Sequence, residues 1–343
     1  MALLNYIRRF CFWLLILLAL SCQNEKKVIP SYVPSLMEIP QGFPSIDFPE
    51  GNAFSETRWA LGKKLFFDPV MSANSSISCA TCHLPELAFS DNQAFSPGVE
   101  NRPGTRNASP LFNLAYHPYF TREGGVPTLE MQILVPIQEH NEFDFNIVLI
   151  AERLAQDSTY QTMAQLAYDR EPDAFVITRA LANFERSLLS GYSRYDQHFN
   201  YDLDKILTAS ELRGRDLFFS KKTDCANCHG DSNFTNYDFQ NNGLYESYED
   251  VGRFRLTGLE ADRALFKVPS LRNIELTAPY MHDGSMVSLE EIVDHYNSGG
   301  KNNPQKSNLI RPLNLTDSDK NDLVNFLKTL TDEAFVSNPI FQN

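Results

Sequence analysis

The chain has 343 residues and a mass of 39.0 kDa, a length that allows one large domain or two of ordinary size. Hydrophobic residues make up 43% of it and charged residues 21%, which excludes a disordered or fibrous chain and a protein with many membrane spans. The formal net charge of −13 argues against a nucleic-acid partner, because binding to phosphates requires clustered cations. Six cysteines are too few for a disulfide-built scaffold of this size.

The first 21 residues have the pattern of a secretory signal. Arg8 and Arg9 precede the apolar run Phe10 to Leu20, which is well short of the ~20 residues that span a bilayer. Cys22 and the polar residues after it resemble the start of a bacterial lipoprotein, in which this cysteine carries lipid. An uncleaved helical anchor is the alternative. We therefore expect a signal peptide over residues 1–21 and a periplasmic protein anchored by lipid at Cys22.

The rest of the chain is predicted to be mainly α with long loops, because alternating strand patterns are scarce. Residues 22–54 are rich in proline and read as an extended leader or tether without a packed core. Ordered structure is predicted to start near Ser55, before an apolar-periodic stretch. The later predicted helices are Phe145–Ala167, Asp173–Leu189, Leu289–Tyr296 and Asp317–Leu330.

Two Cys-x-x-Cys-His motifs indicate the cofactor. In this motif two thiols bond to the vinyl groups of a haem, and the histidine is the proximal ligand of its iron. A thioredoxin-like redox pair would need a βαβ context, and a zinc site needs no histidine after each cysteine pair. We expect two covalently bound haems c. The attachment and ligand residues are Cys79, Cys82 and His83 in the first motif and Cys225, Cys228 and His229 in the second.

The sequence around the two motifs is repeated. Leu61–Phe67 before the first motif is echoed by Leu212–Phe219 before the second, and Pro118–Glu130 after the first by Pro279–Glu290 after the second. Each half therefore supplies a helix, a haem-attachment loop and a later distal segment. We predict a mainly α protein with two cytochrome-c-like domains, each holding one haem c.

The repeat also predicts a difference between the two haems. With the N-terminal haem domain over residues 55–200 and the C-terminal one over 201–335, equivalent positions should approach equivalent faces of the haems. Six residues beyond the shared glutamate lies Pro136 in the first half and Tyr296 in the second. Proline has no side-chain atom that binds iron, whereas a phenolate can bind it. We infer an open face on the first haem and two protein ligands on the second.

Several runs resemble bacterial di-haem cytochrome c peroxidases, a family with a MauG branch. They occur in family order: Leu65–Pro69, Arg106–Pro110, Leu181–Arg186, Lys267–Asn273, Ala278–Gly284 and Asp294–Gly299. The resemblance implies that hydrogen peroxide is reduced to water at the N-terminal haem, with electrons from a small cytochrome c or copper protein through the C-terminal haem. It also implies a calcium ion between the domains, at positions matching Asn107, Thr277 and Pro279.

The resemblance also assigns the catalytic residues. Gln132 and Glu142 match the distal glutamine and glutamate of the family, and Pro136 matches the proline between them. Cleavage of the O–O bond needs a group that takes a proton from one oxygen and delivers it to the other. A carboxylate can do both, so Glu142 is the predicted acid/base. Without the family match, a solvated loop carboxylate would be the simpler interpretation of Glu142.

Three positions depart from the family pattern. Val99 stands where many members have a histidine that blocks the first iron, so we predict a site that is open in the oxidised resting state. The tryptophan commonly found between the haems falls at Arg122. Tyr296 replaces the usual methionine ligand and resembles the MauG branch, which oxidises a protein substrate. Met281 or Met286 is the alternative iron ligand.

One further histidine is assigned to the haem region. His282 pairs with Arg122 in the repeat, so we place it near the second haem or in the gap between the haems. Three functions stay open: a cytochrome-c peroxidase, which we favour, a MauG-like enzyme that oxidises a protein, and a non-enzymatic di-haem electron carrier. Gln132 and Glu142 argue against the carrier. We expect membrane contact only through the N-terminal lipid, and a homodimer is one assembly that the sequence leaves open.

Overall fold

The computed structural model describes residues 35–343, so the predicted signal peptide and Cys22 lie outside the described residues. The described part is mainly helical, as predicted. Its two short strands, β1 (Phe239–Gln240) and β2 (Phe266–Lys267), pair antiparallel. Within residues 35–343 no helix combines the length and the apolar character needed to cross a membrane.

Most predicted helices form with small changes at their ends. α2 (Glu56–Phe67) starts after Ser55, whose hydroxyl accepts a hydrogen bond from the backbone N of Arg58 at 3.2 Å. The other helices are α3 (Cys79–Cys82), α4 (Leu129–Gln132), α5 (Leu134–Gln138), α6 (Ile147–Leu154), α7 (Ser158–Tyr168), α8 (Ala174–Arg186), α9 (Arg194–Phe199), α10 (Ala209–Phe218), α11 (Phe254–Thr257), α12 (Leu289–Ser298), α13 (Asp317–Lys328) and α14 (Glu333–Val336).

One predicted helix is wrong. The single helix expected over Phe145–Ala167 is divided into α6 and α7. Asp157 lies between them, with an extended backbone, and its carboxylate accepts a hydrogen bond from the backbone N of Thr159 at 2.7 Å. An aspartate in this position caps a new helix rather than continuing the old one.

The sequence repeat appears as two closely crossed helix pairs, α2 with α8 and α10 with α13. A glycine makes each crossing possible. A Cβ atom added to Gly62 would lie 1.9 Å from the carbonyl oxygen of Ala180, and one added to Gly214 would lie 1.9 Å from that of Asp322. Both halves thus bring two helix backbones into contact at the same place in the repeat.

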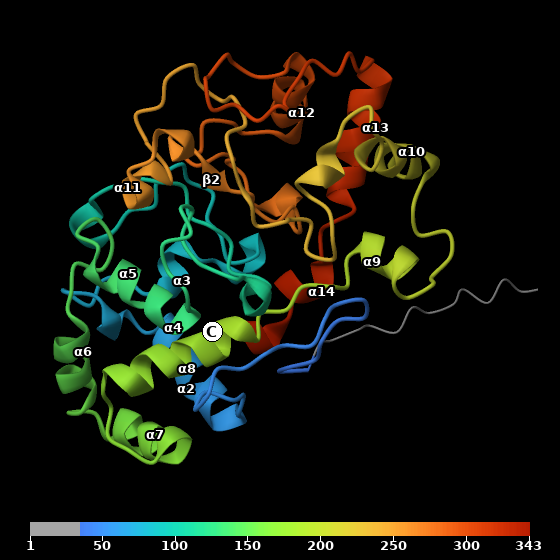
Figure 1. Ribbon diagram of the computed structural model, residues 1–343. Helices are drawn as coiled ribbons and strands as arrows, with labels where there is room; N and C mark the ends of the chain where they lie inside the picture. The colour runs from blue at the N-terminus through green and yellow to red at the C-terminus, as the bar shows by residue number, and fades with distance from the viewer. Residues whose placement is uncertain (1–34) are drawn as a thin grey trace, which may run out of the picture. The chain divides into compact units, whose positions relative to one another are not determined.

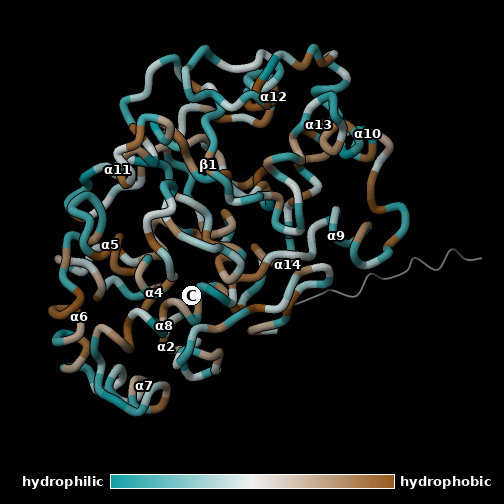
Figure 2. Tube along the Cα trace, in the orientation of Figure 1, coloured by the Kyte–Doolittle hydropathy of each residue, from teal (hydrophilic) through white to brown (hydrophobic). Residues whose placement is uncertain are grey.

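The buried apolar residues form two clusters. The first is built around α2 and α8, and the second around α10, α12 and α13, which gather at another end of the described body in Figure 1. Phe335 and Phe341 near the C-terminus belong to the first cluster, and the chain end lies beside α8 in Figure 1. In Figure 2 the traces of α5 and α6 are largely brown, and part of this apolar character is on the surface, since Val148 is 56% exposed.

A buried polar network joins the two halves at Ser190. Asn113 donates to the backbone carbonyl of Ser190 at 2.8 Å, and Asn273, its counterpart in the repeat, donates to the Ser190 hydroxyl at 3.0 Å. The Asp332 carboxylate accepts hydrogen bonds from that hydroxyl at 3.1 Å and from the backbone N of Gly191 at 2.9 Å. Because these groups are buried and mutually bonded, they fix the position of one half against the other.

The described part of the predicted leader, residues 35–54, contains no helix or strand but is not a free tether. Pro40 is buried, and a Cβ atom at Gly191 would lie 2.3 Å from its ring. The Phe43 ring packs 5.5 Å from that of Tyr116, centroid to centroid. The leader therefore packs against the body where the two halves meet.

We predict that Gly214→Ala destabilises the protein, because the added methyl group meets a backbone carbonyl that belongs to a packed helix. Overpacking of this kind lowers the free energy of unfolding by about 1–3 kcal/mol. Gly104→Ala is the control, since its nearest neighbour is 3.4 Å away. Chemical denaturation measures both, and equal stability of the two variants would contradict the close crossing.

Candidate haem sites

Each Cys-x-x-Cys-His motif forms a short turn that presents its side chains together. The first motif is α3, followed at once by His83, and the second is a 3-10 turn over Cys225–Asn227. All four motif cysteines are free and half-buried. Burial raises the pKa of each thiol, to about 11 for Cys82. The thiols are therefore protonated and are not joined in a disulfide, and thioether formation requires such reduced cysteines.

The two histidine rings are held in the same way. His83 Nδ1 lies 2.8 Å from the carbonyl oxygen of Phe89, and His229 Nδ1 lies 3.1 Å from that of Phe234. A carbonyl only accepts, so Nδ1 carries the proton and Nε2 has its lone pair free. Burial lowers the pKa of both imidazoles, to about 4 for His229, so both are neutral. The residues fit a haem c at each motif.

The backbone at these two acceptors is unusual. Phe89 has φ 60° and Phe234 has φ 50°, in the left-handed region that bulky residues rarely adopt. The same uncommon conformation at equivalent places in both halves turns each carbonyl toward its imidazole. Such conformations cost about 1–3 kcal/mol and persist where the surroundings require them.

Gln132 is positioned by an ion pair next to it on α4. Glu130 accepts from both Arg186 amino groups, at 2.6 and 2.8 Å, and from Asn52 at 2.8 Å. This anchors α4 on α8 and buries the Gln132 side-chain oxygen, which has no hydrogen-bond partner. An unpaired buried acceptor is costly. Its presence fits a site that receives a donor when its ligand is bound.

Glu142 is brought back toward the first motif by a turn after α5. Pro136 accepts from the backbone N of Phe143 at 3.1 Å, and the Glu142 carbonyl accepts from Val99 N at 2.9 Å. The negative charge of Glu142 contributes to the raised pKa of both Cys79 and Cys82. The structure therefore places Glu142 near the first haem-attachment turn.

The environment of Glu142 suits an acid/base. Glu142 is an exposed residue, but the protein atoms packed near its carboxyl remove part of its water. This desolvation, and then the negative charge of Glu139, raises the pKa of Glu142 to about 7. Val99 is buried beside it, and its side chain holds no atom that could bind iron. A Cβ at Gly98 would lie 2.0 Å from the Asn141 carbonyl oxygen, which ties this loop closely to the Glu142 turn.

Tyr296 lies on α12 beside the second motif. Burial raises the pKa of Tyr296 to about 12, while a hydrogen bond from the Asn242 side chain opposes this rise. The alternative ligand Met281 accepts a hydrogen bond at its sulfur from Asn242 at 3.2 Å. Met286, the other alternative, packs at the edge of the second apolar cluster.

Arg122 and His282 meet at Asn107. Arg122 donates to the backbone carbonyl of Asn107 at 2.7 Å and lies 3.4 Å from its side-chain oxygen. The backbone N of Asn107 donates to the His282 carbonyl at 2.9 Å, and the His282 ring stacks on Phe266 with centroids 4.4 Å apart. Arg122 and His282, which are equivalent positions of the repeat, thus both contact Asn107.

The contact between Arg122 and Asn107 argues against the calcium site predicted at Asn107. Asn107 is 8% exposed, and both of its oxygens lie within hydrogen-bonding distance of the Arg122 guanidinium. Thr277, also buried, directs its hydroxyl at the Ile274 carbonyl, at 3.5 Å, and Pro279 packs near Gly284. A calcium ion at Asn107 would share these oxygens with a buried cation. The residues present do not fit calcium there.

The sequence interpretation missed Glu185. This residue lies on α8 and is 7% exposed, and its carboxylate accepts no hydrogen bond from the described residues. Burial raises the pKa of Glu185 to about 8, and its charge is the main electrostatic contribution to the raised pKa of Cys79. The sequence did contain a signal for Glu185, because a glutamate on the apolar face of a predicted helix is unusual.

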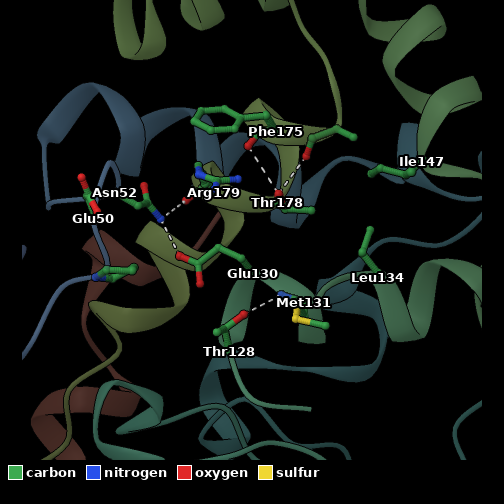
Figure 3. Close-up of a pocket in the computed structure, with 12 residues that line it drawn as sticks. Glu50, Asn52, Thr128, Glu130, Met131, Leu134, Ile147, Phe175, Thr178 and Arg179 are labelled. Carbon is green, nitrogen blue, oxygen red and sulfur yellow. Dashed lines mark hydrogen bonds between the residues drawn. The ribbon is translucent and has the colours of Figure 1, made fainter.

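A depression of about 420 Å³ lies outside the haem sites. Figure 3 shows it between residues 49–52, α4 and α8, with Glu130, Arg179 and Met131 among its labelled residues. None of the predicted haem-binding or distal residues lines it. It is therefore an outer surface of the elements that hold Gln132, separate from the haem sites.

Comparisons with known proteins identify relatives of this chain. A family model described as di-haem cytochrome c peroxidase matches residues 56–204, and one described as cytochrome c matches residues 212–331. The methylamine utilization protein MauG of Methylorubrum extorquens is 38% identical over 84% of this chain and 82% of its own length. The cytochrome c551 peroxidase of Nitrosomonas europaea is 33% identical over 79% of each chain.

A solved structure is also similar. The crystal structure of a MauG-like protein associated with microbial copper homeostasis superimposes with a TM-score of 0.85 at 34% identity. The match covers 89% of this chain and 98% of that one. The two cytochrome-c-like domains predicted from the repeat are therefore confirmed.

We predict that the protein needs no calcium, because the Arg122 guanidinium already bonds the Asn107 oxygens. A chelator should leave the melting temperature unchanged, and the purified protein should hold no stoichiometric calcium. Arg122→Gln removes the cation, so added calcium should raise the melting temperature of this variant only. Calcium bound to the natural protein, with a fall in melting temperature on its removal, would contradict this assignment.

Proposed function

The chain belongs to the di-haem cytochrome c peroxidase family, and we propose that it reduces hydrogen peroxide to water at the haem attached to Cys79 and Cys82. The observation that carries this proposal is the pair of distal groups in the first half. Glu142, with a pKa of about 7, lies near the attachment turn, and the Gln132 oxygen is buried without a partner. A plain electron carrier has no use for either feature.

The haem, held by Cys79, Cys82 and His83, would supply a redox-active iron with which peroxide could react. The protein residues then move the protons. As a carboxylate, Glu142 takes a proton from one peroxide oxygen and returns it to the other, which leaves as water. Gln132 hydrogen-bonds peroxide through its amide and holds it toward Glu142. With two electrons and two further protons taken up, one peroxide yields two molecules of water.

The electrons enter through the second haem. What supports this part is the different distal residue, since Tyr296 lies next to Cys225 and Cys228 where the first half has Pro136. We assign Tyr296 rather than Met281 as the second protein ligand, because Tyr296 stands at the position of the repeat that Pro136 occupies in the first half. The donor is a small cytochrome c or copper protein.

A second function is favoured by one observation. Tyrosine in place of methionine at position 296 is an anionic oxygen ligand, which stabilises oxidised iron. A protein similar to MauG and bearing this ligand could oxidise a protein substrate instead of a small electron donor. The two functions differ in turnover: a peroxidase consumes peroxide rapidly with reduced donor, whereas the MauG-like enzyme does so slowly.

We place either reaction outside the cytoplasm. Covalent haem c at both motifs and the amino-terminal pattern of residues 1–21 support export, and Cys22 supports attachment to a membrane by lipid.

Glu142→Gln tests the proposed proton transfer. The amide keeps the size of the side chain but takes up no proton, so we expect peroxide turnover to fall by about 10²–10⁴-fold. Glu139→Gln is the matched control, a neighbouring glutamate whose carboxylate contributes charge but no proton transfer, and it should retain turnover. Stopped-flow kinetics of the full holoprotein measure both. Equal turnover in Glu142→Gln and the natural protein would refute the role of Glu142.

The pH dependence follows from the same carboxyl group. Below its pKa of about 7, Glu142 is protonated and accepts no proton, so turnover should rise with pH through about 7 and then level off. In Glu139→Gln a neighbouring negative charge is gone, so this rise should move to lower pH. A profile that is flat across neutral pH, or a rise that does not move in Glu139→Gln, would count against Glu142 as the base.

A further inference from the structure

The second half carries a row of aromatic rings that leads inward from the surface. Tyr245 is 36% exposed, and no other tyrosine among residues 35–343 is as exposed. Its ring centroid lies 5.4 Å from that of Tyr248, which in turn lies 5.9 Å from the His282 ring. His282 stacks on Phe266 at 4.4 Å. The rings are in contact one after another.

The row is connected to the second haem site. The Tyr248 hydroxyl lies 3.4 Å from the side-chain oxygen of Asn242, and the same Asn242 side chain acts on Tyr296. Tyr248 also affects Tyr296 electrostatically. One exposed phenol is thus joined, through one half-buried phenol and one amide, to the residue assigned as distal ligand.

The exposed phenol has a proton acceptor in place. The Tyr245 hydroxyl donates to the Asp283 carboxylate at 2.6 Å. Oxidation of a phenol by one electron makes its proton strongly acidic, so the electron leaves easily only where a base receives the proton. Asp283 follows His282 directly, so the base and the ring row belong to the same segment.

We propose that Tyr245 is the surface site at which a protein reductant delivers electrons to the haem pair. This inference rests on the proposed function, because the haem pair oxidised by peroxide is the oxidant. In each step Tyr245 loses one electron inward through Tyr248 and its proton to Asp283. The resulting neutral tyrosyl radical takes one electron from the docked protein and its proton back from Asp283. Two such steps reduce one peroxide.

The test detects the radical directly. The full holoprotein is mixed with hydrogen peroxide without any donor, frozen within milliseconds and examined by EPR, using protein with ring-deuterated tyrosine to identify a tyrosyl signal. The natural protein should give this signal, and Tyr245→Phe should lose it. Tyr248→Phe and Asp283→Asn should each slow its appearance, because one removes the oxidisable phenol between Tyr245 and Asn242 and the other removes the base.

A matched control exists in the first half. Tyr160 also donates to a carboxylate, that of Asp68, at 2.6 Å, but it is buried and far along the chain from the second haem site. Tyr160→Phe should leave the radical signal unchanged. Covalent coupling gives a second readout, since an exposed tyrosyl radical joins two protein molecules through dityrosine. Mass spectrometry should find the cross-link at Tyr245, and Tyr245→Phe should abolish it.

The outcomes separate this inference from the proposed function. Consumption of peroxide with no tyrosyl signal, or with a signal that persists in Tyr245→Phe, overturns the role of Tyr245 and leaves the peroxide reaction standing. If the holoprotein does not react with peroxide at all, both proposals fall. Loss of the signal in Tyr245→Phe with peroxide consumption retained supports the assignment.

Discussion

The site depends on the hydrogen bonds that hold His83 and His229. Each ring directs Nδ1 at a phenylalanine carbonyl, so each Nε2 is available to an iron and the ring orientation is fixed. Both carbonyls come from left-handed phenylalanines, Phe89 and Phe234, which are held by their packing in the two apolar clusters. The strained backbone occurs at equivalent places in both halves, because it directs each carbonyl toward the histidine ring that it orients.

The two halves hold their histidines in the same way, but they differ in the residues expected on the opposite side of each haem. Pro136 has no N–H to bond back to the Gln132 carbonyl, so the first-half helix is interrupted at Ile133 and divided into α4 and α5. The following turn returns Glu142 to the site. In the second half α12 runs unbroken to Ser298 and carries Tyr296 with it. One proline thus accounts for much of the difference between the site that we propose to be catalytic and the site that we propose to transfer electrons.

Local signals predicted much of this structure. The attachment motifs, the cap at Ser55 and the repeat depend on residues close in sequence, and they led to the correct fold class. The break at Asp157 was also local and was missed, because apolar periodicity outweighed a capping aspartate. The contact of Arg122 with Asn107 and the ring row at Tyr245 depend on residues that only the folded chain brings together. The sequence shows Glu185 on a helix, but it does not show that Glu185 lies near Cys79 in the folded chain.

We propose that two similar haems differ in their ligands, with protein ligands on one side of the first iron and on both sides of the second. An EPR spectrum of the oxidised resting holoprotein measures this most directly. We expect one high-spin and one low-spin ferric signal, with the high-spin signal lost when peroxide is added. Two low-spin signals that do not respond to peroxide would contradict it.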